Sequence, residues 1–266
     1  AINSSDLAAI EIAVPSPAEQ QKIAECLSSL DGLIAAEGRT LEALKAHKKG
    51  LMQQLFPQPG QTQPSLRFPE FQKGREWGEK KLSEITSAIF DGTHQTPTYT
   101  EAGIPFYSVE NLISGNANKF ISKEDYDLET KKNKPEKGDI LLTRIGKIGF
   151  SQVVTWDHEF SVYVTLAVIK RSSQFNSYYL HCLMQSDFYQ SELRSKSLSN
   201  AVPPKINMDN LRETKVLVPI LAEQQRIADC LISLDTQIAA QAAKIESLKQ
   251  HKRGLMQQLF PVPEVS

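Results

Sequence analysis

A run of short polar side chains in the segment FDGTHQTPTYTEAGIPF, residues 90–106, is the strongest candidate for contact with another molecule. Its four hydrogen-bonding residues are Thr93, His94, Gln95 and Thr96. The Asp-Gly pair before them favours a tight turn, and Pro97 keeps the residues that follow extended. Side chains of these types on an irregular loop could bind base edges or phosphates of nucleic acid. The alternative is an Asx-type turn in which they bind their own backbone.

Two further segments concentrate basic residues, KKNKPEKGD at 131–139 and TRIGKIG at 143–149. Such runs are usually solvated loops, so each is a weak indication of nucleic-acid binding by itself. Between residues 66 and 204 there are 17 Lys and Arg and 17 Asp and Glu, so this part of the chain is neutral. The whole chain has a formal net charge of −1, which excludes a protein that finds nucleic acid by bulk positive charge.

Catalytic motifs are missing from the sequence. It contains no GxSxG, no HExxH, no P-loop, no GxGxxG after a strand and no NPPY-like tetrapeptide of an amino-methyltransferase. None of the five His has metal-ligand spacing to another His or to a Cys. We therefore expect no catalytic residue, no metal and no cofactor in this chain. Three Cys without a CxxC indicate a cytoplasmic protein, and no apolar run approaches the roughly 20 residues of a membrane helix.

An internal repeat encloses the middle of the chain. Residues 14–31 (VPSPAEQQKIAECLSSLD) match residues 218–235 (VPILAEQQRIADCLISLD) at an offset of 204. When 1–57 is aligned with 205–261 without a gap, 32 of the 57 positions are identical. The period is far longer than the roughly 20–50 residues of a solenoid, so two copies of one element bracket a unique domain. This predicts three parts, residues 1–57, 58–204 and 205–266.

Each copy is expected to form a short strand, a proline and one long helix. The strand-like runs are IEIAVP at 10–15 and TKVLVP at 214–219. The AEQQ segment then begins a helix with Glu19 or Glu223 in its first turn, where the helix dipole favours an acidic residue. The proline of LMQQLFP ends it after roughly 38 residues, or about 57 Å. A helix of this length needs a partner along its side.

The apolar spacing indicates that the two helices form a coiled coil. Residues on the expected seam alternate at spacings of three and four. They are Leu27, Leu30, Ile34, Leu41, Leu44, Leu51 and Leu55 in the first copy, and Leu231, Leu234, Ile238, Ile245, Leu248, Leu255 and Leu259 in the second. Polar residues interrupt both seams at matching places, Glu37 with Gln241 and Lys48 with Lys252. The alternative is two unrelated amphipathic helices, each packed on its own globular core.

We expect the pair to be antiparallel, since one helix leads into the middle domain, the other leaves it, and domain termini usually lie close together. The middle domain is predicted to be α+β, with a small mixed sheet, so that the chain resembles a head on a stalk. Expected strands fall within residues 81–90, 104–112, 138–146, 149–156 and 161–170. A helix is expected at 177–196, with an apolar face of Tyr178, Tyr179, Leu183, Met184, Phe188 and Leu193.

Taken together, these features resemble the specificity (S, HsdS) subunits of type I restriction–modification systems. The resemblance rests on DGTHQTP followed by GIPF, on GDILLTRIGKIG, and on KINMDNLRETKVLVPILAEQQRIADCL opening a long helix. Members of the family carry two target-recognition domains, each followed by a long helix, and the two helices pair as an antiparallel spacer. The resemblance therefore implies a further recognition domain before residue 1, so that this chain corresponds to the C-terminal part of a subunit or to a half-subunit.

The resemblance implies a DNA-binding specificity subunit without catalysis of its own. It would read one half of a bipartite site on double-stranded DNA, and the coiled coil would set the spacing to the other half; half-sites one turn apart lie about 34 Å from each other. Its implied partners are modification subunits, which would bind S-adenosylmethionine and methylate adenine, and restriction subunits, which would use ATP and Mg²⁺. Two copies of the chain could also form a homodimer that restores two recognition domains.

The residues expected to face DNA follow from the same resemblance. They are Thr93, His94, Gln95, Thr96, Arg144, Lys147, and, within SKSLSNAVPPK at 195–205, Lys196, Ser199, Asn200 and Lys205. Arg or Lys could bind guanine, and Gln95 or Asn200 adenine. Phosphate contacts are expected from Lys131, Lys132 and Lys134.

Two other functions remain open from the residues alone. One is a coiled-coil adaptor whose middle domain binds another protein. The other is a self-contained nuclease with an unrecognised site, for which Asp91, Asp139 and Glu110 are the candidate acids.

Overall fold

A computed structural model describes residues 3, 5, 8 and 14–260. Contacts divide the chain into two compact units. The helical unit comprises residues 1–47 and 234–266, and the recognition unit comprises residues 48–233. Most of the strand expected at 10–15 lies outside the described residues. Within the described part of the chain, no helix is long and apolar enough to cross a membrane.

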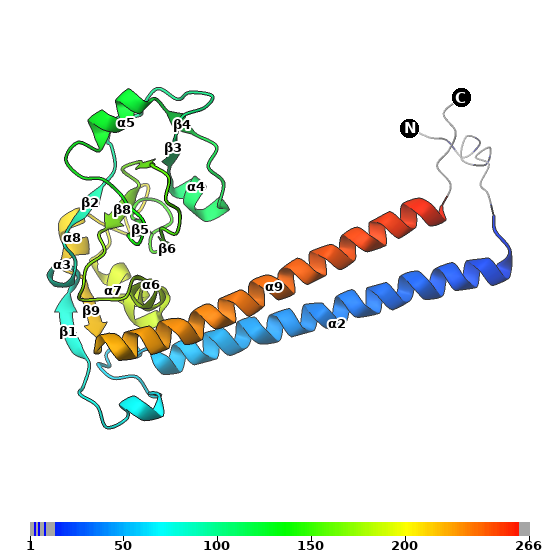
Figure 1. Ribbon diagram of the computed structural model, residues 1–266, viewed down its shortest axis with the longest axis horizontal. Coiled ribbons are helices and arrows are strands. Elements are labelled where there is room, and N and C mark those ends of the chain that lie inside the picture. The colour runs from blue at the N-terminus through cyan, green and yellow to red at the C-terminus, as the bar shows by residue number, and fades with distance from the viewer. Residues whose placement is uncertain (1–2, 4, 6–7, 9–13, 261–266) are drawn as a thin grey trace. The chain divides into compact units, whose positions relative to one another are not determined.

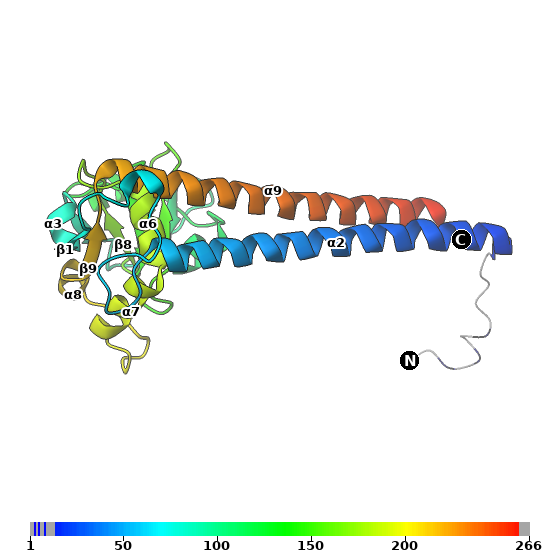
Figure 2. The same ribbon diagram turned by 90° about the horizontal axis from the view of Figure 1, so that it is seen from below.

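The helical unit is built from the greater part of two long helices, α2 (Pro17–Leu55) and α9 (Leu221–Leu259), each of 39 residues. The last turns of α2, residues 48–55, and the first turns of α9, residues 221–233, belong to the recognition unit. The two helices run side by side in both views (Figures 1 and 2). Lys244 Nζ lies 2.6 Å from Glu37 Oε1, and Lys252 Nζ lies 2.6 Å from Asp31 Oδ1. Glu37 pairs with Lys244, whereas Asp31, which lies earlier in α2, pairs with Lys252, which lies later in α9. The predicted antiparallel pairing is therefore confirmed.

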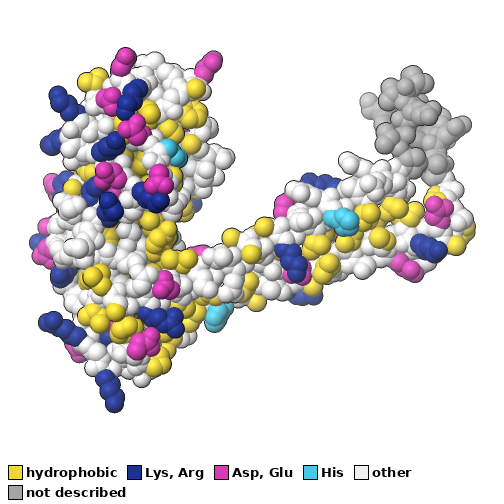
Figure 3. Space-filling model, viewed as in Figure 1, with side chains coloured by type: hydrophobic (Ala, Val, Ile, Leu, Met, Phe, Trp, Pro, Cys, Tyr) yellow, Lys and Arg dark blue, Asp and Glu magenta, His cyan; other side chains and the backbone are white. Residues whose placement is uncertain are grey.

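The seam follows the predicted alternation of three and four. Within α2 the partly buried positions include Leu27, Leu30, Ile34, Leu41 and Leu44, whereas most residues between them are exposed. Yellow apolar side chains follow the length of the helices in Figure 3. Each helix buries its apolar stripe against the stripe of the other helix. This removal of apolar surface from water holds the two helices together.

A polar pair marks the centre of the helical unit. Gln241 Nε2 donates hydrogen bonds to Glu37 Oε2 at 2.6 Å and to the Glu37 carbonyl oxygen at 3.0 Å. Hydrogen bonds from Lys244 and Gln241 hold the pKa of Glu37 below its usual value. The two seam residues occupy equivalent positions of the sequence repeat, 204 apart. An antiparallel pair in which a residue meets its own equivalent has a pseudo-twofold axis at that point.

The recognition unit contains three small sheets. Its strands are β1 (Gly78–Lys81), β2 (Ile89–Asp91), β3 (Ile104–Tyr107), β4 (Phe120–Ile121), β5 (Ile140–Thr143), β6 (Ser151–Val153), β7 (Ser161–Val162), β8 (Leu166–Ile169) and β9 (Lys215–Val218). The largest sheet has the order β2-β8-β5-β6 and is antiparallel throughout; a second has the order β4-β3-β7, in which β3 and β7 are parallel; and β1 pairs with β9.

Short helices connect and cover these sheets. They are η1 (Pro69–Phe71), α3 (Leu82–Ile85), α4 (Val109–Ser114), α5 (Lys123–Glu129), α6 (Ser177–Gln185), α7 (Asp187–Lys196) and α8 (Met208–Arg212). Every residue of the central strands β5 and β8 is buried, which explains their unbroken apolar runs. The main core cluster comprises Tyr107, Leu112, Leu141, Val154, Phe160, Val162, Leu166 and Val168. The predicted α+β class is confirmed.

Four sequence expectations were wrong in detail. The run 161–170 is not one strand, because a turn separates β7 from β8, and the two strands belong to different sheets. The run 81–90 is not one strand, because the Lys81 N–H donates to Glu84 Oε2 and caps α3, which buries Leu82 and Ile85. The run 104–112 is a strand only over β3, because Ser108 caps the N-terminus of α4 and the residues after it are helical. The helix expected at 177–196 is broken at Ser186, whose hydroxyl accepts the Tyr189 N–H at the start of α7. Tyr178, placed on its apolar face, is exposed.

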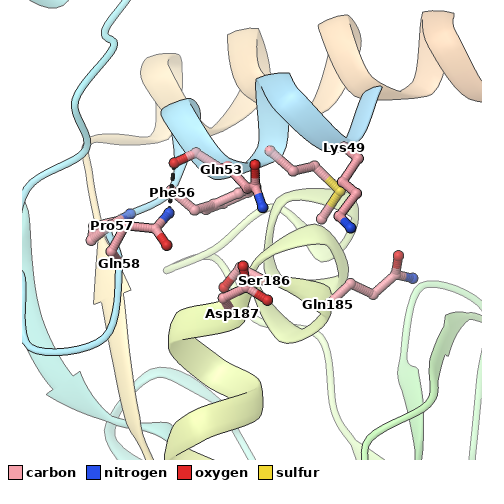
Figure 4. Close-up of a pocket in the computed structure, with 9 residues that line it drawn as sticks. Lys49, Gln53, Phe56, Pro57, Gln58, Gln185, Ser186 and Asp187 are labelled. Carbon is pink, nitrogen blue, oxygen red and sulfur yellow. Dashed lines mark hydrogen bonds between the residues drawn. The ribbon is translucent and has the colours of Figure 1, made fainter. Parts of the chain in front are cut away.

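Within the recognition unit, Phe56 follows the last turn of α2 and packs against α6. The Phe56 ring is buried, with its centroid 5.8 Å from that of Tyr179 on α6. A small pocket lies beside it, between the end of α2 and the α6–α7 junction; Figure 4 shows Phe56 and Gln58 facing Ser186 and Asp187 across this space. Burial of an aromatic ring of this size stabilises the contact by about 1.5–3 kcal/mol.

The first turn of α9 is fixed by a buried ion pair. Glu223 accepts hydrogen bonds from Arg67 Nε at 2.8 Å and Arg67 Nη2 at 2.6 Å, and only 1% of the Glu223 side chain is exposed. The bond to Glu223 raises the pKa of Arg67 above its ordinary value. The repeat-equivalent residue of the other helix, Glu19, is exposed. The repeat therefore supplies the same side chain in two different environments.

The difference between these environments predicts two unequal substitutions. We expect Glu223→Gln to lower the free energy of unfolding by about 3 kcal/mol, because Arg67 would keep a buried charge without its carboxylate. The matched change Glu19→Gln should alter it by less than about 0.5 kcal/mol. Urea unfolding followed by circular dichroism measures both. Equal effects at the two positions would contradict the ion pair as the source of the stability.

Candidate nucleic-acid interface

The DGTH loop that follows β2 is held against the segment after β7. The Thr93 N–H donates to the Val162 carbonyl oxygen at 3.1 Å, and the Val164 N–H donates to the Thr93 carbonyl oxygen at 3.0 Å. Gly92 lies so close to this segment that a Cβ atom there would overlap the Val162 carbonyl oxygen. The loop backbone is thus fixed before any ligand binds, and a side chain at residue 92 is excluded.

The predicted contact residues of this loop differ in accessibility. Thr93 is partly buried, while His94, Gln95 and Thr96 are exposed. The Thr93 hydroxyl donates to the Gln95 carbonyl oxygen and accepts the Gln95 N–H, each at 3.3 Å, so part of the loop does bind its own backbone, as the alternative of a self-satisfied turn proposed. His94 Nε2 also lies 3.0 Å from Asp91 Oδ2. Gln95 and Thr96 extend beyond this turn, and Thr96 Oγ1 lies 3.4 Å from the Tyr163 hydroxyl.

Arg144 lies behind the loop rather than on the surface. Its Nη1 donates to Asp91 Oδ2 at 3.0 Å and to the Val164 carbonyl oxygen at 2.8 Å, and its Nε donates to the Ile206 carbonyl oxygen at 3.2 Å. Burial lowers the pKa of Arg144, and the nearby Asp91 carboxylate opposes that shift. This placement favours a structural role over the contact with DNA expected from the sequence.

Backbone hydrogen bonds join the loop after β5 to the segment 195–205. The Gly146 N–H donates to the Pro204 carbonyl oxygen at 2.8 Å, and the Ile206 N–H donates to the Arg144 carbonyl oxygen at 2.9 Å. The Leu198 N–H donates to the Lys205 carbonyl oxygen at 2.7 Å and closes a loop. Ser199 and Asn200 are exposed at the tip of this loop, which runs from residue 198 to residue 205. Lys205 is partly buried, and Lys196 lies 3.8 Å from Glu192 on α7.

Thr96 and Lys147, 51 residues apart in sequence, line one hollow of about 350 Å³, hereafter the tyrosine hollow. Its lining comprises Thr96, Tyr99, Ser108, Val109, Glu110, Lys119, Ile145, Gly146, Lys147, Tyr163 and Thr165. Three of the lining residues, Tyr99, Lys119 and Tyr163, were not among those expected from the sequence to face DNA. The THQTPTYT run and the aromatic residue of VYVT were visible signals, because aromatic residues beside polar loops often contribute to binding surfaces.

The basic run 131–139 lies by a second hollow, of about 230 Å³, which Lys132 lines together with Asp91, Thr93 and Glu129. Burial raises the pKa of Glu129 above its usual value. Lys134 is already engaged, because its Nζ lies 2.9 Å from Glu159 Oε1. Lys131 and Lys132 are exposed, so they remain the better candidates for phosphate contacts. Basic and acidic side chains alternate over the face of this unit seen in Figure 3.

The acidic residues considered for a nuclease do not gather in one place. Asp91 is bound to Arg144, Asp139 is fully buried and lies 2.8 Å from Lys170 Nζ, and the Glu110 side chain is exposed on α4. Throughout residues 14–260, no group of three or more His, Cys, Asp or Glu is arranged to hold a metal ion. The geometry therefore gives the nuclease hypothesis no support.

The close approach at Gly92 predicts a position-specific effect. Gly92→Ala should destabilise the recognition unit by about 1–3 kcal/mol, because the added methyl group would displace the Val162 backbone. Gly38→Ala in α2 is the matched control, since open space surrounds it and alanine favours a helix by about 0.5–1 kcal/mol. Thermal and urea unfolding measure both. A Gly92→Ala protein as stable as the unmodified chain would contradict the contact.

Solved structures share this fold. The S subunit of a type I restriction–modification system from M. genitalium superposes with a TM-score of 0.64 at 19% identity, over 98% of this chain and 66% of that one. The HsdS subunit from Thermoanaerobacter tengcongensis gives a TM-score of 0.59 at 18% identity, over 98% and 62%.

Sequence relatives point the same way. The MjaVIII and MjaIX specificity subunits of type I restriction enzymes from Methanocaldococcus jannaschii are each 26% identical to this chain, over 94% and 97% of its length. The chain spans about 61% of each of these relatives. The family model described as the type I restriction modification DNA specificity domain matches residues 1–46 and 74–250. The chain therefore belongs to the family of type I restriction–modification DNA specificity domains.

Proposed function

We propose that this chain is the DNA-reading part of a type I restriction–modification complex and that its recognition unit reads one half of a bipartite site. The observation that carries the proposal is the convergence of three loops. Backbone hydrogen bonds tie the segments around Thr93, Arg144 and Lys205 together, although they are far apart in the sequence. Exposed amide, hydroxyl and ammonium groups on such loops suit contact with base edges and phosphates.

The chain is proposed to act without catalysis of its own. Modification subunits would bind S-adenosylmethionine and methylate adenine, and restriction subunits would use ATP and Mg²⁺, while this chain would hold no cofactor. A cytoplasmic location follows from the DNA that it would read. The alternative of a protein-binding adaptor shares the helices but predicts an apolar contact face without charged groups, whereas Lys119, Lys147 and Glu110 line the tyrosine hollow.

Assembly with a modification subunit tests this function directly. Co-purification of the chain with the modification subunit of its own system should yield adenine methylation at one defined sequence, and the chain by itself should yield none. DNA affinity of the complex should fall steeply with salt, because lysine–phosphate contacts release counterions. Methylation that ignores sequence, or nuclease activity that persists in the purified chain, would contradict the proposal.

A second recognition domain is proposed to cover the other ends of the two helices. The pseudo-twofold axis relates Phe56, whose side chain is 1% exposed, to Phe260, which is 49% exposed. Gln224 Nε2 donates to the Pro219 carbonyl oxygen within the recognition unit, and Gln20 Nε2 makes the same bond to Pro15. The start of the first helix thus has the same local structure as the start of the second helix, which packs within the recognition unit. When the 266-residue chain is by itself, the recognition unit of a second molecule of the same chain would cover these helix ends.

The docking proposal predicts a self-association that one substitution removes. The 266-residue chain should sediment as a dimer at micromolar concentration, and Phe260→Ser should shift it to a monomer, because the apolar ring that fills the contact is lost. His251→Ser, which removes an exposed side chain elsewhere on α9, is the control and should leave the dimer intact. A strict monomer of the unmodified chain would contradict the homodimer.

A further inference from the structure

The tyrosine hollow has a rigid aromatic wall. The Tyr163 ring lies 6.0 Å from that of Phe106, and the Phe106 ring lies 5.9 Å from that of Tyr99, measured between centroids. Phe106 is fully buried, so it fixes the two tyrosines from behind. The Tyr163 backbone is held as well, because its N–H donates to the Tyr107 carbonyl oxygen at 2.8 Å. Aromatic side chains fixed in this way present area and hydroxyl groups at small entropic cost.

Cationic groups line the same hollow from two directions. Lys119 Nζ lies 5.4 Å above the Tyr99 ring and 3.9 Å from Glu110 Oε2. Lys147 is exposed at its rim, after Gly146, whose positive φ of 81° turns the loop toward the segment at Pro204. Two ammonium groups against one carboxylate give the lining a net positive charge, which suits an anionic ligand.

The floor of the hollow holds hydroxyl groups that are poorly satisfied. The Tyr163 hydroxyl has only a 3.4 Å contact with Thr96 Oγ1, which is long for an O–H···O bond. Thr165 Oγ1 is shielded from solvent and has no hydrogen-bond partner among residues 14–260. The Tyr163 hydroxyl therefore keeps hydrogen-bonding capacity for a ligand in the hollow, and a shorter bond to such a ligand would be more favourable than its contact with Thr96.

From this arrangement we propose that the tyrosine hollow takes one nucleotide of the target DNA and that Tyr163 is a specificity-determining residue. Lys119 and Lys147 bind the phosphate of this nucleotide, and the Tyr99 ring packs against its sugar. The Tyr163 hydroxyl contacts the edge of its base, next to the base pair that Gln95 and Thr96 contact. This inference rests on the proposed function. It adds Tyr99, Lys119 and Tyr163 to the residues expected from the sequence.

The test separates reading of a base from binding of the backbone. It uses the complex with the modification subunit and duplexes that carry the mapped site or each single base-pair variant of it. Tyr163→Phe removes only the hydroxyl and should change the discrimination at one position by about 5- to 150-fold. Lys147→Ala should weaken binding to all duplexes equally and reduce the salt slope by about 1.

Matched variants control for charge and for loss of a tyrosine hydroxyl. Tyr178→Phe on α6 and Lys73→Ala after η1 change exposed residues outside the hollow and should leave both quantities unaltered. A Tyr163→Phe complex with unaltered discrimination, or with equal losses on every duplex, would overturn the inference. An unmodified complex without any preferred sequence would instead contradict the proposed function, and the inference with it.

Discussion

The buried guanidinium of Arg144 is the interaction on which the candidate interface depends. It binds the end of β2 through Asp91, the turn before β8 through Val164, and the segment before α8 through Ile206. A buried charge of this kind is tolerated only with good hydrogen-bonding partners, so its three contacts specify one arrangement. The DGTH loop and the segment 195–205 each begin or end within a few residues of one of these contacts.

The helical part of the molecule could be predicted from the sequence because its determinants are local and repeated. The apolar spacing, the polar interruptions at Glu37 and Gln241, and the proline after each helix all appear twice. Pairing in the antiparallel sense followed from chain connectivity alone. The start of α9 was predicted as well, but its fixation by Arg67 was not, since that contact joins residues 156 apart.

The recognition unit was predicted in class but not in detail. Its buried central strands were visible as apolar runs, whereas the helices at Leu82 and Val109 depend on capping by nearby side chains that propensity does not reveal. Among the residues expected to face DNA, Gln95 and Lys147 are exposed, and their contact with DNA stays a prediction. Residue type could not show that Arg144 is buried or that Tyr163 lies beside Thr96 in the tyrosine hollow, because both environments exist only in the folded chain.

The mismatch at the pseudo-twofold axis, where a carboxylate in one helix meets an amide in the other, has a consequence for how chains sort their helices. Two first helices brought together in the same antiparallel register would oppose two Glu37 carboxylates, a repulsive encounter. Joining of unlike helices instead offers a charge-assisted hydrogen bond. The difference between Glu37 and Gln241 thus favours the pairing of a first helix with a second helix over the pairing of two first helices.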